Sequence, residues 1–301
     1  MHENILDPEL RAILDAKGRA DGRPVATNAN ALPVRRVLSL TQALAHKPLA
    51  QSRVLDLACQ EGCYALEAAL AGAEAVGVEA RAHHVARAKI CAQRLGLQDK
   101  VRFEIGDVRA IDAQTFGAFD IVFFLGILYH LDANDAAETL ARLAGVASDL
   151  LIIDTHVALS PKATFTFRGR AYEGAYVREH NESDSAAERE KRLQASIDNT
   201  FSFYFTRAAL ARLLVEVGFS TVLEAHAPLD ATKPEDRVTL AVSKAPLHDV
   251  QIYPWVAGLS EDALAETARP FLPPRPGGGR TALARLANRL LHPLGFTLAR
   301  R

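Results

Sequence analysis

The stretch VLDLACQEGCYALEAA, residues 54–69, decides the fold. A short apolar run reaches an acidic residue, Asp56, and the chain then turns around a single glycine, Gly62, into a helical pattern. A strand, a tight turn and a helix in this order open the nucleotide-type sites of parallel α/β sheets. Ala58 and Gln60 occupy the positions where a dinucleotide-binding turn has its first two glycines. The stretch therefore predicts such a site and raises the question of which cofactor accepts these two residues.

The same alternation of β-rich and helical segments continues along the chain as far as Ser243. Strands are expected at residues 53–58, 74–79, 101–107, 119–126 and 150–156. Helices are expected at residues 63–71, 83–95, 135–146 and 207–217. The central strands are apolar throughout, as expected when helices cover both faces of a parallel sheet. The pattern predicts a doubly wound α/β fold.

Two more β-rich runs, residues 220–227 and 237–245, are separated by a polar turn region and not by a helix. Neighbours of this kind pair as an antiparallel hairpin, which we expect at one edge of the sheet. The complete prediction is a mostly parallel, seven-stranded sheet that ends in a C-terminal antiparallel hairpin. This is the methyltransferase variant of the doubly wound fold and not the dehydrogenase variant.

Three segments fall outside the regular pattern. Residues 1–52 are predicted to form a helical cap over the cofactor end of the sheet, and residues 53–246 the cofactor-binding domain. Within that domain, residues 157–206 are too long for an ordinary connection and are predicted to form a lid. Residues 247–301 form a tail with a Pro/Gly-rich hinge and a basic amphipathic helix. Its segment 277–301 has alternative uses, which are docking on a protein, on a second copy of the chain, on the chain's own core or on an anionic membrane surface.

Composition limits the classes of function. The chain has 301 residues and a formal net charge of -1, so no overall basic field recruits nucleic acid. No apolar stretch approaches the roughly 20 residues of a membrane span. The charged N-terminal segment lacks a secretory apolar core, and three cysteines form no CxxC pair, which favours a cytoplasmic protein with reduced thiols.

Acidic residues stand at the ends of three successive expected strands. Asp56 closes the first strand, Glu79 ends the second and Asp107 follows the third. Glu79 is placed to accept hydrogen bonds from both ribose hydroxyls, and Asp107 to meet an adenine amino group beside the amide of Val108. S-adenosylmethionine (SAM) has no phosphate, so it needs an acidic neighbour and a tight turn but no glycine path for a pyrophosphate. The sequence therefore predicts SAM as the cofactor.

Four motifs, VLDLACQEG, AVGVEAR, IGDVR and FDIVFFLGILYHL, resemble those of class I SAM-dependent methyltransferases. Two segments, FFLGILYHL and NTFSFYFTRAALARLLVEVGF, resemble a narrower branch that includes the wobble-uridine carboxymethyltransferases and bacterial homologues. The resemblance covers roughly residues 50–243. It implies that the SAM pocket is lined by Asp56, Ala58, Gly62, Glu79, Asp107, Val108 and Leu125.

Tyr129 and His130 follow the fourth expected strand and are predicted to lie near the sulfonium. Methyl transfer is an in-line displacement, in which the protein positions the nucleophile and removes its proton. His130 is a candidate base, and Tyr129 a contact to cofactor or substrate; the alternative is that His130 only shapes its loop. Asp154 and His156 end the fifth strand on the same edge, but no spacing is diagnostic of a metal site and we predict none.

The expected lid joins arginines to two aromatic clusters. Arg168, Arg170 and Arg178 are a candidate anion clamp, because a guanidinium suits carboxylate or phosphate. The alternative is a solvated lid helix with packed aromatics beneath it. An acidic or phosphorylated small molecule, or a sugar, is the expected acceptor. The candidate substrate residues are His156, Arg168, Arg170, Tyr172, Tyr204 and Arg237.

Three functions are compatible with these features. The first is a SAM-dependent methyltransferase that acts on a hydroxyl or amine of a small metabolite or sugar-like acceptor. The second follows the narrower resemblance and is wobble-uridine alkylation of tRNA with SAM or carboxy-SAM, for which Arg237 would neutralise the extra carboxylate. The near-neutral charge gives no basic stripe of the size that RNA needs. The third is an inactive SAM-binding scaffold that works through its tail.

Overall fold

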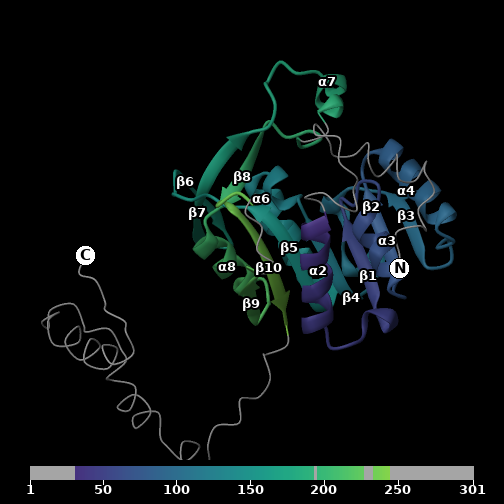
Figure 1. The fold of residues 1–301 in the computed structure, drawn as a ribbon. Helices are drawn as coiled ribbons and strands as arrows, with labels where there is room; N and C mark the ends of the chain where they lie inside the picture. Colours follow the sequence, from purple (N-terminus) through teal and green to yellow (C-terminus); the bar gives the residue numbers. More distant parts are fainter. Residues whose placement is uncertain (1–30, 193–194, 227–232, 245–301) are drawn as a thin grey trace, which may run out of the picture. The chain divides into compact units, whose positions relative to one another are not determined.

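A computed structural model describes residues 31–192, 195–226 and 233–244 of the chain (Figure 1). The predicted tail at residues 247–301, with its docking segment 277–301, lies outside the described residues. Of the predicted N-terminal cap, the structure describes helix α2 (Ala31–Leu44) and the short 3-10 helix η2 (Leu49–Gln51). Within the described ranges, no helix combines the length and the apolarity that crossing a membrane requires.

The central element is a sheet of seven strands in the order β3-β2-β1-β4-β5-β10-β9. The strands are β1 (Arg53–Leu57), β2 (Glu74–Glu79), β3 (Val101–Ile105), β4 (Phe119–Leu125), β5 (Ala147–His156), β9 (Thr221–Glu224) and β10 (Arg237–Ser243). The first five are parallel, and β10 is antiparallel to both β5 and β9. The predicted fold class and terminal hairpin are confirmed. Strand order reverses between β1 and β4, which is where parallel sheets of this kind bind ligands.

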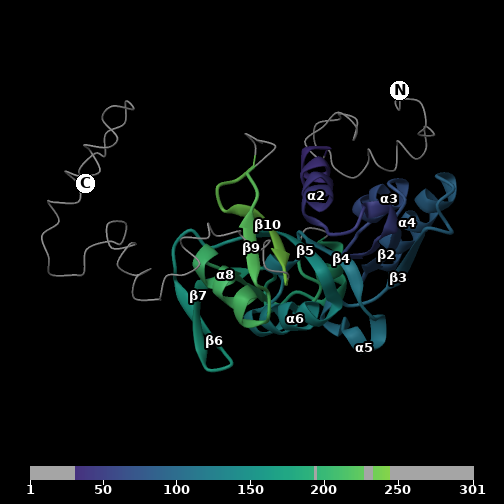
Figure 2. The same cartoon turned by 90° about the horizontal axis from the view of Figure 1, so that it is seen from below.

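Helices cover both faces of this sheet (Figure 2). One face carries α2, α3 (Cys63–Leu70) and α4 (Ala82–Arg94), and the other α5 (Ala113–Phe116), α6 (Ala133–Val146) and α8 (Arg207–Glu216). Alternate side chains of one strand enter the two cores, so that Phe123 packs on the α3 side and Phe124 on the α6 side. This double burial is the reason that the central strands are mostly apolar on both of their faces.

Two helices show how local sequence sets their start. The oxygen of Thr206 accepts a hydrogen bond from the amide of Ala209 at 3.2 Å, so α8 begins at the residue expected. Asp132 caps α6 by accepting from the amide of Asp135 at 2.8 Å, and the helix begins at Ala133. The predicted start at residue 135 was wrong by two residues because the Asp132 cap was overlooked.

Residues 157–206, the predicted lid, form a separate three-stranded antiparallel sheet and one short helix, here called the cap insertion. Its elements are β6 (Ala163–Phe167), β7 (Arg170–Arg178), α7 (Ala186–Lys191) and β8 (Phe201–Phe205). Phe203 and Phe205 are buried against α6 and α8, and the amide of Phe203 donates to the carbonyl of Leu131 at 3.0 Å. The sequence predicted the insertion but not its sheet.

Candidate functional site

The turn after β1 is the first part of the site. Ala58, Gln60 and Gly62 have positive φ angles of 54°, 50° and 78°. A Cβ atom on Gly62 would lie 2.4 Å from the ring of Phe103 on β3, so close packing as well as the left-handed conformation requires glycine there. Asp56 is buried beneath the turn and accepts a hydrogen bond from the amide of Ala65 at 3.1 Å. Asp56 thus fixes the first turn of α3 to the end of β1.

Glu79, the last residue of β2, joins two loops of the site. Its carboxylate accepts the amide N–H of Gln60 at 3.0 Å and that of Arg81 at 2.9 Å. The side chain is almost completely buried, although it borders the pocket. The carboxylate therefore holds the loops after β1 and β2 together at the edge where a ribose is expected.

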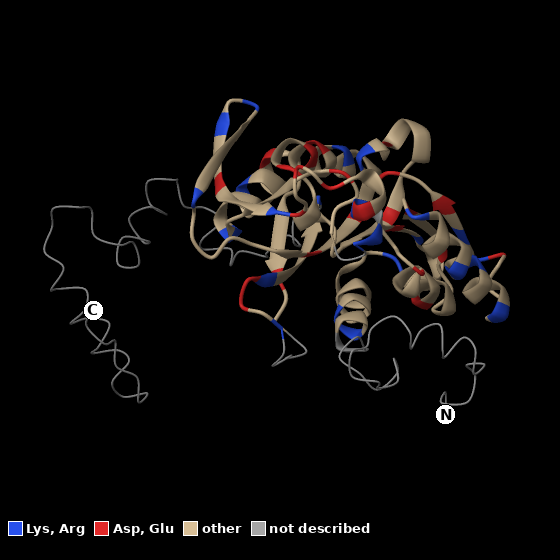
Figure 3. Ribbon diagram, turned by 90° about the horizontal axis from the view of Figure 1, so that it is seen from above, with Lys and Arg blue, Asp and Glu red and all other residues tan. Residues whose placement is uncertain are grey.

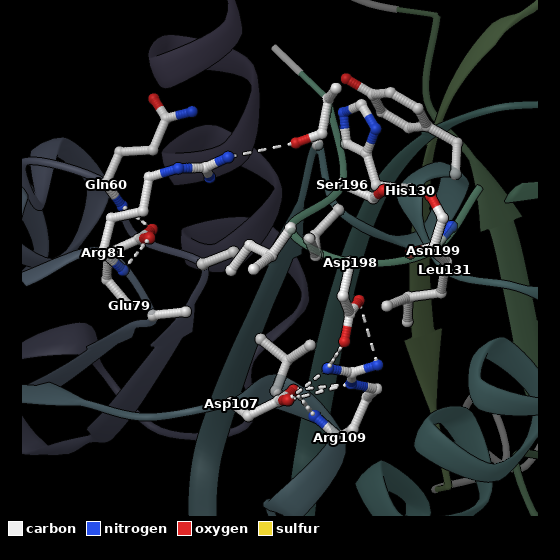
Figure 4. A pocket seen from close by; sticks show the side chains of 18 residues that line it. Gln60, Glu79, Arg81, Asp107, Arg109, His130, Leu131, Ser196, Asp198 and Asn199 are labelled. Carbon is white, nitrogen blue, oxygen red and sulfur yellow. Dashed lines mark hydrogen bonds and ion pairs between the residues drawn. The ribbon is translucent and has the colours of Figure 1, made fainter. Parts of the chain in front are cut away.

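Asp107, which follows β3, is held by a neighbouring arginine. It accepts the amide of Arg109 at 2.8 Å and the guanidinium nitrogens of the same residue at 2.6–3.0 Å. Burial opposes ionisation of Asp107, but these hydrogen bonds outweigh it and hold the pKa of its carboxyl below the usual value. Arg109 also contacts Asp198 of the cap insertion at 2.7 Å (Figure 4). An ionised acceptor therefore stands at the rim, connected to the cap.

A pocket lies above the ends of β1, β2, β3 and β4 (Figure 4). The empty space among its lining residues amounts to about 760 Å³, part of which is open to solvent. The core contributes Ala58, Gln60, Glu79, Ala80, Arg81, Asp107, Val108, Arg109, Gly126, Ile127, Tyr129, His130 and Leu131, and the cap insertion residues 195–199. The guanidinium of Arg81 donates to the carbonyls of Arg192 and Ala195 at 3.3 Å each, which ties the cap wall to the core.

Among the predicted cofactor residues, Ala58, Glu79, Asp107 and Val108 line this pocket. The other three lie behind the lining. Asp56 and Gly62 shape the turn, and Leu125 packs partly buried against the core, so that the next residue, Gly126, reaches the pocket instead.

Tyr129 and His130 lie together in the 3-10 turn η4 (Leu128–His130), and both line the pocket. The Nδ1 atom of His130 is 3.0 and 3.1 Å from the two carboxylate oxygens of Glu179 in the cap insertion. The ring of Tyr129 is 4.2 Å from that of His130, 4.7 Å from His156 and 5.9 Å from Tyr204, measured between centroids. The predicted residues at the reacting end are thus neighbours in space.

A polar network at the β5–β10 pair borders this aromatic group. Asp154 accepts from Nε of Arg237 and from the hydroxyl of Thr239, each at 2.6 Å. Arg237 also reaches His156, with 3.3 Å between Nη1 and Nε2, and its guanidinium lies 5.5 Å from the ring centroid of Tyr129. In the part of the chain that the structure describes, no three His, Cys, Asp or Glu side chains are grouped as metal ligands.

Comparison with known proteins finds a family to which the central part of the chain is similar. Residues 49–196 match a protein-family model described as a methyltransferase domain. Over these residues the chain is similar to methyltransferase domains. The predicted resemblance to methyltransferases is confirmed at this level, and SAM is the cofactor that the resemblance implies.

Two curated relatives match parts of the chain. The ubiquinone biosynthesis O-methyltransferase of Psychrobacter cryohalolentis is 31% identical over 91 residues, which are 30% of this chain and 35% of that protein. The 23S rRNA (uracil(1939)-C(5))-methyltransferase of Acidithiobacillus ferrooxidans is 36% identical over 148 residues, which are 48% of this chain and 31% of that protein. The chain thus spans about a third of the length of these relatives.

A solved structure shares the fold of most of this chain. The N-terminal domain of EvdMO1 with SAH bound superimposes with a TM-score of 0.56 and 24% sequence identity, over 71% of this chain and 83% of that one. The comparisons support the broad class and leave the predicted wobble-uridine branch without confirmation.

None of the six predicted substrate residues is among the residues that line the pocket. His156, Tyr204 and Arg237 lie beside Tyr129, which does line it, whereas the other three have partners elsewhere.

Tyr172 is buried, and its hydroxyl donates to Glu216 of α8 at 2.6 Å. Arg170 reaches the same carboxylate at 3.2 Å, and Arg168 lies 4.8 Å over the ring of Phe167 at the β6–β7 turn. Arg178, the third arginine of the predicted clamp, lies 4.8 Å over the ring of Phe201. The three arginines are therefore not grouped as a clamp, because strand alternation and the hairpin turn carry their side chains to different places.

Four charged residues of the site were not predicted from the sequence: Arg81, Arg109, Glu179 and Asp198. Glu179 and Arg109 reach partners 49 and 89 residues away in the chain, His130 and Asp198. Arg109 follows a predicted cofactor residue by two positions, so its nearness to Asp107 was a usable signal. Nothing local marks Glu179, because the pairing depends on how the cap insertion folds back.

Proposed function

We propose that the protein transfers the methyl group of SAM to a hydroxyl of a small acceptor, with His130 as the general base. The observation that carries this proposal is that His130 lines the same pocket as Glu79 and Asp107. A base on one wall and nucleoside-binding carboxylates on the other leave the space between them for the sulfonium and the acceptor.

The chemistry asks little of the protein beyond this geometry. The acceptor oxygen forms a bond to the methyl carbon while the bond from carbon to the sulfonium sulfur breaks, and the hydroxyl proton passes to the imidazole. The products are the methylated acceptor, S-adenosylhomocysteine and a protonated base that returns its proton to water. Tyr129 and Tyr204 supply flat apolar surface beside the reacting groups.

The size of the acceptor follows from the cap insertion, whose residues 195–199 form one wall of the pocket. A small molecule fits such an enclosed space better than a duplex or a folded RNA. One of the relatives is a ubiquinone biosynthesis O-methyltransferase, which supports oxygen as the accepting atom.

His130→Gln is expected to lower methyl transfer by roughly 10²–10⁴-fold, because the proton then has no positioned acceptor. Binding of SAM should stay unchanged, since the base does not hold the nucleoside. The assay follows label from methyl-labelled SAM into a panel of phenols, hydroxy acids and sugars, with calorimetry for SAM affinity. His83→Gln, an exposed histidine on α4, is the matched control.

Two results would contradict the proposal. Transfer at the wild-type rate by His130→Gln would remove the imidazole as base. Tight SAM binding with no labelled product from any acceptor would favour the scaffold function instead.

One observation favours a second candidate, the use of carboxy-SAM. The Nη2 atom of Arg237 lies 3.6 Å from where a Cβ of Gly126 would be, so a guanidinium that is paired with Asp154 stands beside the end of the pocket near Tyr129. Figure 3 shows basic and acidic segments interspersed over the described chain, which gives a tRNA substrate little support. Calorimetric competition decides the cofactor: at least tenfold tighter binding of carboxy-SAM than of SAM would favour this candidate.

A further inference from the structure

Glu179 lies in the cap insertion, immediately after β7, and its carboxylate crosses to the imidazole of His130 in the core. Both side chains are largely buried, with exposed fractions of 7% for Glu179 and 14% for His130. The two carboxylate oxygens are 3.0 and 3.1 Å from Nδ1, so the contact is shared by both. An acidic side chain from an inserted segment thus meets the candidate base of the core.

We propose that Glu179 is the positioning residue of His130, which it holds in the tautomer with the proton on Nδ1 and the lone pair on Nε2. This inference rests on the proposed function only where it makes the lone pair on Nε2 the base that accepts the acceptor's proton. An ionised carboxylate accepts hydrogen bonds and donates none, so Nδ1 must carry the hydrogen in the neutral ring. Nε2 is then the basic atom that can take a proton from an acceptor hydroxyl.

The charge state of Glu179 agrees with this geometry. Burial by itself would raise the pKa of its carboxyl, but hydrogen bonds and the charge interaction with His130, together with the amide of Ser196, outweigh burial and leave the pKa below its usual value. The carboxylate is therefore ionised at neutral pH, which is the form that the tautomer assignment requires.

The surroundings prevent Glu179 from turning away. Its Oε2 accepts the amide of Ser196 at 3.1 Å, and its own amide donates to the carbonyl of Thr200 at 2.9 Å. The Ser196 hydroxyl donates to the carbonyl of Asn199 at 2.8 Å, which fixes the segment that supplies this amide. On the core side, the Tyr129 ring packs beside the imidazole. The pair is thus held from both the cap insertion and the core.

The tautomer can be measured without any acceptor. Two-bond ¹H–¹⁵N correlation spectra of ¹⁵N-histidine-labelled protein, saturated with S-adenosylhomocysteine, separate Nδ1–H from Nε2–H rings. The chain has 10 histidines, so the His130 signals are assigned by their loss in His130→Gln. We expect wild-type His130 to show the Nδ1–H pattern in its neutral form.

Glu179→Leu should lose this pattern and show Nε2–H, the form that free imidazole side chains favour. Glu182→Leu, a change at an exposed glutamate in the same insertion, should leave the spectrum of His130 as in the wild type. Calorimetry with S-adenosylhomocysteine checks that each variant is folded. If other groups set the tautomer and Glu179 only supports the fold, the tautomer of His130 will not depend on Glu179.

The assignment is overturned if wild-type His130 carries its proton on Nε2, or if Glu179→Leu keeps the Nδ1–H pattern. The wild-type spectrum alone is decisive if the leucine variant fails to fold. These outcomes are separate from failure of the proposed function: full methyl transfer by His130→Gln would refute the base, whatever the tautomer.

Discussion

Glu79→Gln is expected to weaken SAM binding by about 1–3 kcal/mol, which is roughly a 5- to 150-fold loss of affinity. The carboxylate of Glu79 accepts two backbone amides, those of Gln60 and Arg81, and is 4% exposed. A glutamine has one acceptor oxygen, so its NH₂ group would face one of these donors. The loops after β1 and β2 would then lose the carboxylate that connects them. The ribose hydroxyls of SAM would lose a charged hydrogen-bond acceptor.

Calorimetric titration with SAM measures this effect directly. Glu74→Gln is the control, because this substitution removes the same charge from an exposed residue at the start of the same strand. Equal affinities for the Glu79 and Glu74 variants would show that the carboxylate at the end of β2 has no part in cofactor binding.

Gly62→Ala is expected to lower the free energy of unfolding by about 2–5 kcal/mol. The left-handed backbone costs about 1–2 kcal/mol for a residue with a Cβ, and overpacking of a filled core adds about 1–3 kcal/mol. The added carbon would sit 2.4 Å from two ring atoms of Phe103. Either the ring or the turn must move, and the turn is part of the cofactor site.

Gly96→Ala separates the two contributions. Gly96 also has a positive φ, 68°, but a Cβ there would meet no atom within 4 Å. Chemical denaturation of both variants should therefore show a larger loss for Gly62→Ala, and shortening the ring in the double variant Gly62→Ala/Phe103→Leu should recover part of the difference. Equal losses at the two glycines would disprove the clash with Phe103.

The cofactor half of the site could be predicted because its signals are local. In parallel strands the carboxyl ends share one edge, so Glu79 and Asp107 could be placed near each other from the strand pattern alone. The exception is Asp56, the last residue but one of β1, which lies buried under the turn. The turn at Gly62 lets α3 begin near the end of β1, and the amide of Ala65 in this helix donates a hydrogen bond to the carboxylate of Asp56.

The acceptor half could be predicted only in part. Tyr129 and His130 follow β4 directly, so the strand pattern placed them correctly at the edge. The strands of the cap insertion pair with one another, and the insertion then folds back on the core. No short-range periodicity in the sequence predicts which of its side chains reach the pocket. For that reason Glu179 was missed, and Arg168 and Arg170 were assigned to a clamp that they do not form.

The turn after β1 has an energetic consequence for the cofactor. Ala58 and Gln60 take left-handed φ angles although each has a Cβ. A side chain narrows the conformations open to a free loop, whereas glycine widens them. Less motion is then left to freeze when the nucleoside arrives, so the entropic penalty of association is smaller than for a glycine-rich loop. Part of the free-energy cost of ordering this loop is therefore incurred during folding, when Ala58 and Gln60 adopt strained φ angles.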